Sequence, residues 1–174
     1  MASTGTSEQN FVKERSKKYY SKVKSYTVEK NTNLLSSAAD WQISGDLPSL
    51  DAYPEIIKSS GQRPDIVVYS ESLKSVIMVE LTVPFETRIE FQHQYKMAKY
   101  EDLANQIRKS GYAAVIMAVE VGARGFVGTS VYNLLTRLGL KSKKRTKAMK
   151  NLAVIAEKSS SWLWSRRNES RLMK

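Results

Sequence analysis

Two kinds of hydrophobic spacing divide the chain into expected strands and helices. β-branched residues crowd positions 65–69 and 76–83, which is typical of strands. Only a short polar stretch separates the two runs, so we expect an antiparallel hairpin. Residues 112–121 form a continuous apolar run, which predicts a strand buried on both faces. Trp41 and Ile43 alternate with polar residues and predict a further short strand.

Helical signals follow the hairpin and the apolar strand. Residues 87–110 predict a helix that stops at Gly111, and residues 129–138 predict a shorter one that ends at Gly139. Glycine is expected at these ends because it readily takes the backbone conformation that closes a helix. Three further segments are an expected polar helix over 11–26, a proline-containing loop with one helical turn over 47–61, and a long amphipathic helix over 143–167.

The spacing of apolar residues in the last helix predicts which of its side chains pack on the domain. The members of this stripe, three and four residues apart, are Leu152, Ile155, Ala156, Ser159 and Trp162. We therefore expect Trp162 in the core. Trp164 lies off the stripe, where it can stack on a base or join an interface.

The order of hairpin, helix, strand and helix predicts an α/β fold with a mixed β-sheet flanked by helices. A chain of 174 residues is long enough for one domain with a substantial core. We expect a disordered N-terminus over 1–10, a core domain over 11–140, and a basic C-terminal helix within 141–174 that packs on the core or extends it.

Composition removes several classes of protein. The chain has no cysteine and one histidine, His93, which excludes a disulfide scaffold, a thiolate zinc site and a histidine-rich metal site. No apolar run approaches about 18 residues, and the first residues are polar, so we expect an intracellular protein without a membrane span. His93 is expected at the surface or bonded to a neighbour, and as an alternative it reaches the site as a helper base.

The net charge of +11 is concentrated at one end of the chain. The last 34 residues hold 11 basic and 2 acidic residues, whereas residues 1–140 are nearly neutral. Such a segment favours contacts with the phosphates of a nucleic acid. The alternative is a solvated helix face with no ligand.

The predicted hairpin brings two carboxylates together. If its turn is centred between Ser72 and Leu73, residues whose numbers sum to 145 face each other, and Asp65 then opposes Glu80. Two opposed carboxylates repel. A divalent cation such as Mg²⁺ or Mn²⁺ between them removes this conflict, since both prefer oxygen ligands.

Glu80 also interrupts an apolar strand. Strand alternation places it on one face with Met78 and Thr82, and a buried unpaired carboxylate is costly. A metal site explains its presence, and a salt bridge to a lysine or arginine is the alternative.

The expected helix over 87–110 carries a lysine on the face that lies toward Asp65 and Glu80. Lys96, Tyr100, Leu103 and Ile107 are spaced four, three and four apart, so they share a face that packs on the sheet. Lys96 should therefore approach Glu80, where an ammonium can orient a water or stabilise charge on a phosphate. Its alternative is to extend past the apolar surface to solvent.

These residues resemble the PD-(D/E)xK signature of restriction-endonuclease-like domains, and more narrowly the endonuclease domain of site-specific non-LTR retrotransposons. The pattern is Arg63-Pro64-Asp65, then Glu80 after fourteen residues, then the segment from Lys96 to Tyr100 that matches the family's Lys-x-x-x-Tyr. The likeness covers about residues 40–168. It implies a restriction-endonuclease-like fold, a nuclear location, and a stand-alone or excised module, since no reverse-transcriptase domain is present.

The resemblance also implies the ligands of a magnesium or manganese ion. Asp65 and Glu80 would be metal ligands, with the backbone carbonyl of Leu81 as a third. Asp46 would be the upstream acidic ligand, and Asp51 and Glu55 are the weaker alternatives for that role. The lysine of the ExK element is replaced by Thr82, and its role passes to Lys96 on the helix. The residues expected to support the site are Lys99, Tyr100 and Thr82, while Glu120 can approach the site or an arginine.

The resulting hypothesis is a Mg²⁺-dependent endonuclease that hydrolyses DNA phosphodiester bonds, and the alternative is a catalytically inactive nucleic-acid-binding module of the same fold. RNA also stays open as the ligand, and so does a homodimer, because nucleases of this type often pair to cut two strands. The residues expected to contact nucleic acid are Arg63, Arg124, Lys143, Lys144, Arg145 and Lys147.

Overall fold

The computed structural model describes residues 33–46 and 49–167. The expected disorder over 1–10 and the expected helix over 11–26 lie outside the described residues. The elements in chain order are η2 (Leu34–Ser37), β1 (Gln42–Gly45), α2 (Glu55–Lys58), β2 (Ile66–Ser70), β3 (Ser75–Thr82), η3 (Glu86–Arg88), α3 (Ile89–Lys109), β4 (Ala113–Glu120), α4 (Thr129–Arg137) and α5 (Ser142–Arg166).

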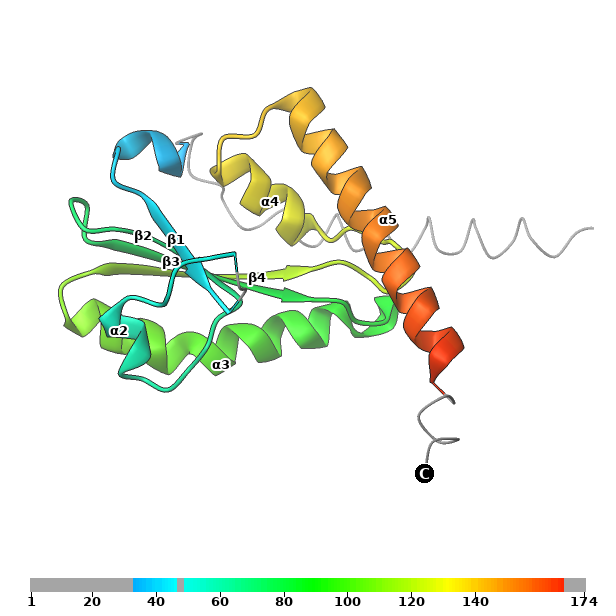
Figure 1. Ribbon diagram of the computed structural model, residues 1–174, viewed down its shortest axis with the longest axis horizontal. Helices are drawn as coiled ribbons and strands as arrows, with labels where there is room; N and C mark the ends of the chain where they lie inside the picture. Colours follow the sequence, from blue (N-terminus) through cyan, green and yellow to red (C-terminus); the bar gives the residue numbers. More distant parts are fainter. Residues whose placement is uncertain (1–32, 47–48, 168–174) are drawn as a thin grey trace, which may run out of the picture. The chain divides into compact units, whose positions relative to one another are not determined.

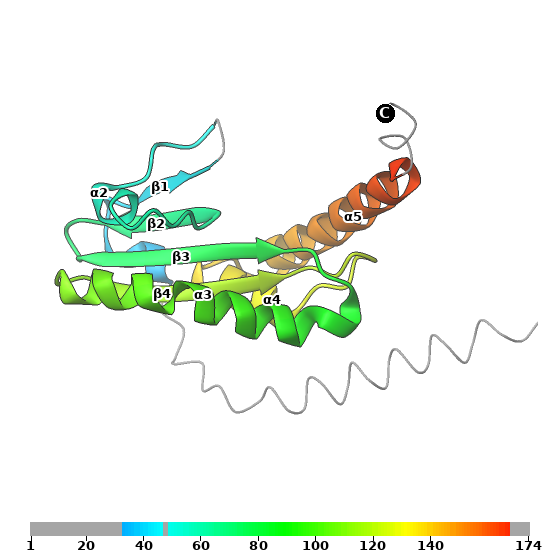
Figure 2. The same ribbon diagram turned by 90° about the horizontal axis from the view of Figure 1, so that it is seen from below.

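The four strands form one mixed sheet in the order β1-β2-β3-β4 (Figure 1). The β1–β2 and β2–β3 pairs are antiparallel, whereas β4 lies parallel to β3. A parallel neighbour requires a crossover, which α3 provides. Helix α3 covers one face of the sheet, and α4 and α5 lie on the other (Figures 1 and 2). The predicted α/β class, with a mixed sheet and flanking helices, is therefore confirmed.

The hairpin has the register that the sequence predicts. Ile66 pairs with Val79 and Ser70 pairs with Ser75, so paired residue numbers sum to 145. Strand β2 begins at Ile66, which leaves Asp65 immediately before the strand. The other expected elements are present with ends shifted by a few residues, and Gly111 and Gly139 have φ angles of 85° and 82° at the ends of α3 and α4.

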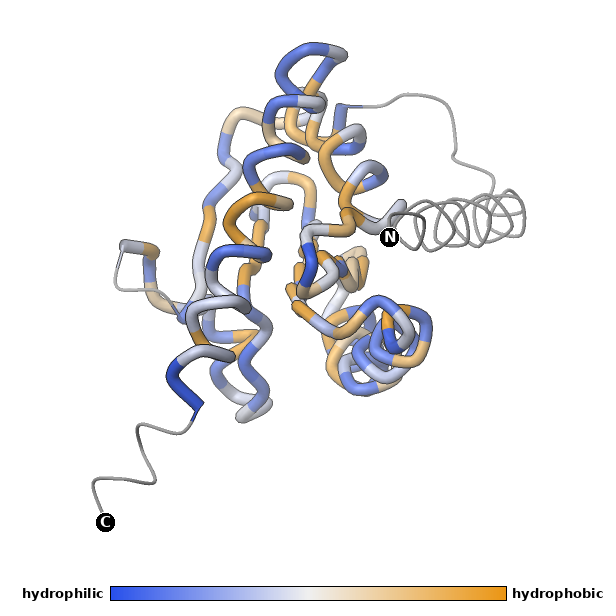
Figure 3. Tube along the Cα trace, turned by 90° about the vertical axis from the view of Figure 1, so that its right-hand side faces the viewer, coloured by the Kyte–Doolittle hydropathy of each residue, from blue (hydrophilic) through white to orange (hydrophobic). Residues whose placement is uncertain are grey.

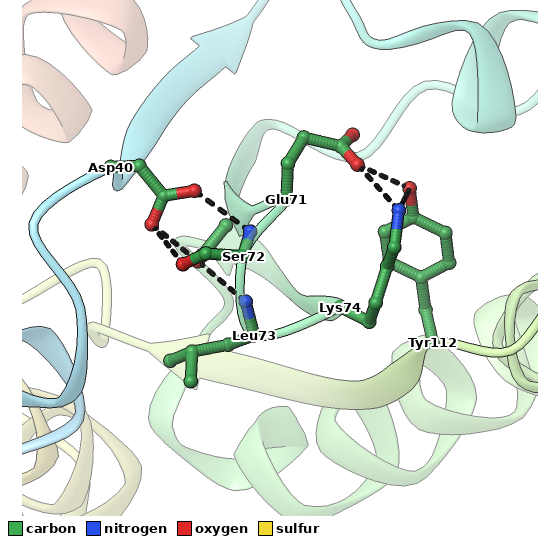
Figure 4. A network of polar contacts seen from close by, with 7 residues as sticks. Asp40, Glu71, Ser72, Leu73, Lys74 and Tyr112 are labelled. Atoms are coloured by element: carbon green, nitrogen blue, oxygen red, sulfur yellow. Dashed lines mark hydrogen bonds and ion pairs between the residues drawn. The ribbon is translucent and has the colours of Figure 1, made fainter.

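Polar contacts fix the hairpin turn from two sides (Figure 4). Asp40 accepts hydrogen bonds from the Ser72 N–H, at 2.9 Å, and from the hydroxyls of Ser72 and Ser70, both at 2.7 Å. These bonds, with the Ser72 N–H foremost, hold the pKa of Asp40 well below its usual value. On the other side, Glu71 accepts a hydrogen bond from the Tyr112 hydroxyl at 2.6 Å. The turn that sets the register is thus tied to the segments before β1 and before β4.

Each face of the sheet carries its own hydrophobic cluster. Under α3, Val67, Val76 and Met78 pack with Tyr100 and other residues of the helix. On the opposite face, the strands pack against α4 and the first half of α5. Figure 3 shows that hydrophilic and hydrophobic residues alternate along α5, the helix that leads to the C-terminus. None of the described helices is both long and apolar enough to cross a membrane.

The predicted packing stripe of α5 is only partly correct. Ala156 is buried and Leu152 is half-buried, but Ile155 and Trp162 are 60% and 55% exposed, and Ser159 is exposed. The expectation that Trp162 belongs to the core is therefore wrong. The reason is that α5 packs through Met149, Leu152 and Ala156. Nearly all of its side chains after Ala156 are exposed.

Candidate active site

Asp65 and Glu80 are joined through each other's backbone. The Asp65 N–H donates a hydrogen bond to Oε2 of Glu80 at 3.2 Å. The Leu81 N–H donates to Oδ2 of Asp65 at 2.7 Å. Glu80 is 3% exposed, whereas Asp65 is exposed at the surface. The hairpin register thus places one buried and one accessible carboxylate side by side.

Two lysines of α3 approach the buried carboxylate. Lys96 Nζ lies 2.5 Å from Oε1 of Glu80, and Lys99 Nζ lies 3.7 Å from the same oxygen. The Lys96 side chain is 19% exposed, so it points inward rather than to solvent, as predicted from the helix face. The alternative explanation for a buried Glu80, a salt bridge to a lysine, is therefore present in the structure. These cations offset the cost of burying the carboxylate.

Two tyrosine hydroxyls hold the segment that precedes Asp65. Tyr100 donates a hydrogen bond to the Arg63 carbonyl at 2.9 Å, and Tyr53 donates to the Pro64 carbonyl at 2.6 Å. Burial, with the Glu80 carboxylate as the next cause, raises the pKa of the Tyr100 hydroxyl above its usual value. Sequence reasoning missed Tyr53, because it lies in a loop without periodicity. Its only signal was an aromatic residue amid prolines.

The other expected metal ligands lie around this pair. Asp46 directly follows β1. Burial is the main cause that raises the pKa of the Tyr53 hydroxyl, and the negative charges of Asp46, Asp65 and Glu80 raise it further. Leu81 is exposed and bonded to Asp65 through its N–H. Among the described residues, no group of three or more histidine, cysteine, aspartate or glutamate side chains is placed to hold a metal ion. Asp46 thus does not complete a three-carboxylate cluster.

The donor set nevertheless suits Mg²⁺. This ion usually binds proteins through one or two carboxylates and keeps several waters. A carboxylate offers about four acceptor positions, and the bonds described above use only some of those on Asp65 and Glu80. Thr82, which replaces the family's lysine, has a buried Oγ1 without a hydrogen-bond partner in the described part of the chain.

The cations predicted to contact nucleic acid do not share one environment. The Arg63 guanidinium lies over the Tyr53 ring, close to Asp65 in sequence. Arg124 pairs with Glu86 at 2.9 Å, and Arg145 donates to the Thr136 hydroxyl at 2.9 Å. The remaining three have exposed side chains in the first turns of α5: Lys143, Lys144 and Lys147. These turns adjoin α4, on the face of the sheet opposite α3 (Figures 1 and 2).

A second polar group lies at the carboxyl end of β4. His93 Nδ1 is 2.9 Å from Oε1 of Glu120, whose other oxygen accepts a hydrogen bond from the Ser130 hydroxyl at 2.6 Å. Glu120 is 2% exposed. Its hydrogen bond raises the pKa of His93, against a smaller opposing effect of burial. His93 is thus bonded to a neighbour, as expected. Its partner is Glu120, which sequence reasoning expected to approach either the site or an arginine.

Comparison with known proteins adds no relative. No protein-family model matches this chain. A search of curated proteins also finds no match. The assignment of a function therefore rests on the geometry of the described residues and on the motif resemblance.

Proposed function

We propose that this protein is a Mg²⁺-dependent endonuclease with a restriction-endonuclease-like fold that hydrolyses DNA phosphodiester bonds and derives from a retroelement. The observation that carries the proposal is the placement of Lys96 Nζ 2.5 Å from Glu80, whose other oxygen is bonded to the Asp65 backbone. Two carboxylates and a lysine converge there from β3, from α3 and from the residue before β2. This is the constellation that the motif requires.

In this proposal, Asp65 and Glu80 would hold Mg²⁺ or Mn²⁺, with the Leu81 carbonyl as a further oxygen donor. A bound ion of this kind lowers the pKa of a coordinated water and polarises the phosphate. Asp65 is the accessible ligand, since it is exposed, while Glu80 is fixed in place by its bonds.

Lys96 supplies the positive charge that the ExK lysine would supply. It reaches the Glu80 carboxylate from α3, although Thr82 occupies the usual lysine position. Its ammonium neutralises charge on the phosphate or orients the attacking water. Lys99 adds a second positive charge, and Tyr100 keeps the segment before Asp65 in place.

The proposed DNA partner is held mainly by positive charge. Arg63 lies next to the carboxylates, and the exposed lysines of α5 add contacts to the backbone that do not read sequence. Because these lysines lie on the opposite face, a duplex that touches both would cross an edge of the sheet. The proposal includes a nuclear location. It leaves open RNA as the ligand and a homodimer as the active form.

A supercoiled-plasmid nicking assay tests the proposed activity. With Mg²⁺ present, we expect Asp65→Asn, Glu80→Gln and Lys96→Met to lower the nicking rate at least 100-fold. Asp102→Asn is the matched control, because this carboxylate is exposed and does not contact the site. No nicking by the wild-type chain, or full activity in Asp65→Asn, would overturn the proposal.

One observation favours the alternative of an inactive nucleic-acid-binding module. Lys96 and Lys99 already neutralise Glu80 without a metal ion. Calorimetric titration with Mn²⁺ separates the two functions. Saturable binding that disappears in Asp65→Asn supports the nuclease, and nucleic-acid binding without uptake of Mn²⁺ supports the inactive module.

A further inference from the structure

The chain's only imidazole is bonded to a buried carboxylate. His93 is the single histidine of the sequence, and it contacts Glu120 at 2.9 Å. Glu120 at the end of β4 is held by two helices. Its backbone N–H and one carboxylate oxygen are bonded to Ser130 in α4, and its other oxygen contacts His93 in α3. An ionised carboxylate can only accept hydrogen bonds, so Nδ1 of His93 is the donor.

This arrangement fixes the role of each ring nitrogen. Nδ1 is occupied by Glu120, which leaves Nε2 as the nitrogen that can meet a ligand. The His93 side chain is 38% exposed, so a ligand can reach it, while the Glu120 side chain is only 3% exposed. A carboxylate in this position orients the imidazole and stabilises its protonated form.

The His93–Glu120 pair lies on the same side of the sheet as the Asp65–Glu80 pair. In the parallel ladder, Glu120 is opposite Thr82, and Thr82 shares a strand face with Glu80 two residues earlier. The backbone positions of Glu80 and Glu120 are therefore about 8 Å apart by strand geometry. On α3, His93 precedes Lys96 by three residues, which makes them neighbours on the helix surface.

We propose that His93, held by Glu120, protonates the leaving oxygen in the phosphodiester hydrolysis proposed above, on which this inference rests. The water oxygen forms a bond to phosphorus, the bond from phosphorus to the leaving sugar oxygen breaks, and that oxygen takes the Nε2 proton to become a hydroxyl. The surplus proton of the water passes to solvent, and the imidazole regains a proton from solvent.

The charges around His93 favour the protonated ring. Glu120 faces it from β4, and Glu90 adds a negative charge from α3, while Lys96 is the positive neighbour one turn along the helix. The pKa of His93 is raised, so the imidazolium persists to a higher pH than in a free histidine. The proton donor is present below this pKa and is lost as the pH rises through it.

The test combines His93→Gln with a change in the leaving group. We expect this variant to nick about 100-fold more slowly at pH 7, in the range measured for acid catalysts, and to lose the fall in rate that the wild type shows on the alkaline side. An oligonucleotide with a bridging sulfur in place of the leaving oxygen needs no proton donor, so on it the variant should match the wild type. Asp102→Asn on the same helix serves as the control.

NMR provides a readout that does not depend on cleavage. The ring signals of His93 are unambiguous because no other histidine exists. We expect their pH dependence to give a pKa above that of a free histidine, and this pKa should fall toward the free value in Glu120→Gln. The signals should also shift when a duplex oligonucleotide is added with Ca²⁺ in place of Mg²⁺.

The outcomes separate the two proposals. Absence of nicking by the wild type overturns the nuclease and this role together. Three other outcomes overturn only the role of His93. They are unchanged nicking in His93→Gln, an equal defect of that variant on the sulfur-bridged substrate, and ring signals that do not shift when the oligonucleotide is added.

Discussion

Glu80 is a buried carboxylate that remains bonded on both of its oxygens. One oxygen accepts from the Asp65 N–H, and the other accepts from Lys96 and faces Lys99. A buried charge is tolerated only when it is paired and hydrogen-bonded. The same bonds that make its burial possible also fix its position.

Replacing Lys96 by methionine should destabilise the fold, because it leaves the buried Glu80 carboxylate with a weaker partner. We expect a loss of about 3 kcal/mol in the free energy of unfolding, measured with urea. Lys99→Met should cost less than half of this, since its ammonium is 3.7 Å from Glu80 and 39% exposed. In the double variant Glu80→Gln, Lys96→Met, much of the loss should be regained; strict additivity of the two changes would contradict direct coupling.

Removing one hydroxyl tests how Asp65 is held. Tyr100→Phe deletes the bond to the Arg63 carbonyl but keeps the fully buried ring. We expect a destabilisation of about 1 kcal/mol, since a partly buried hydrogen bond is lost, and a weaker affinity for Mn²⁺. Tyr95→Phe is the matched control, because that ring is 56% exposed on the same helix. Equal effects of the two substitutions would contradict the positioning role of Tyr100.

Local periodicity made part of the site predictable residue by residue. The distance from Asp65 to Glu80 is fixed by the hairpin turn, and the approach of Lys96 follows from its helical spacing to Tyr100. The bond from Tyr53 to Pro64 and the contact of His93 with Glu120 were not predictable. Each depends on how an element packs on another that is remote in sequence, and no repeat in the sequence encodes such packing.

At the scale of elements, the hairpin register was predictable and the contacts that secure it were not. Turn length and β-branched residues determine which strand residues oppose each other. Asp40 and Tyr112, which hold the turn, are separated from Ser72 and Glu71 by 32 and 41 residues. Helix α5 shows the converse, because an apolar stripe does not reveal how far along a helix its partner surface extends.

The close approach of β1 to the segment before β2 provides a prediction at this scale. A Cβ atom at Gly45 would lie 2.5 Å from the Asp65 carbonyl oxygen and 2.8 Å from Leu50. We expect Gly45→Ala to destabilise the fold by about 2 kcal/mol and to lower nicking, because the backbone of Asp65 must shift.

The control for this prediction is Gly61→Ala. Gly61 has a φ of 71°, and no atom lies within 4 Å of an added Cβ. We expect a loss of about 1 kcal/mol from backbone strain alone, with nicking per folded molecule unchanged. A Gly45→Ala variant with normal nicking would show that β1 does not constrain Asp65.

On the scale of the whole molecule, the lysine-rich start of α5 and the Asp65–Glu80 pair lie on different faces of the sheet. The carboxylates lie on the α3 side, and the lysine-rich start of α5 lies beside α4 (Figure 1). The net charge and its concentration near the C-terminus were evident from the sequence. Its placement relative to the carboxylates was not, because that depends on which face of the sheet each helix crosses.

This separation predicts that binding and cleavage respond to different substitutions. Replacing Lys143, Lys144 and Lys147 by alanine should make DNA affinity less dependent on salt. The slope of log affinity against log salt concentration should become shallower by about 0.9 for each phosphate contact that is lost. The cleavage rate of saturated complexes should stay within about twofold of the wild type. Fluorescence anisotropy at several salt concentrations measures the slope, with Lys109→Ala as the control. An unchanged slope would exclude these lysines as phosphate ligands.

The connection from β3 through α3 to β4 has a further consequence for synthesis of the chain. Arg63, Asp65, Glu80, Lys96 and Glu120 all lie between residues 63 and 120, within one hairpin and the crossover that follows it. When this segment has left the ribosome, every strand pairing of β2, β3 and β4 is possible, while α5 has yet to emerge. The carboxylates can therefore meet their lysines before the lysine-rich helix emerges, so the nascent chain brings these groups together before the segment with most of its net positive charge is exposed.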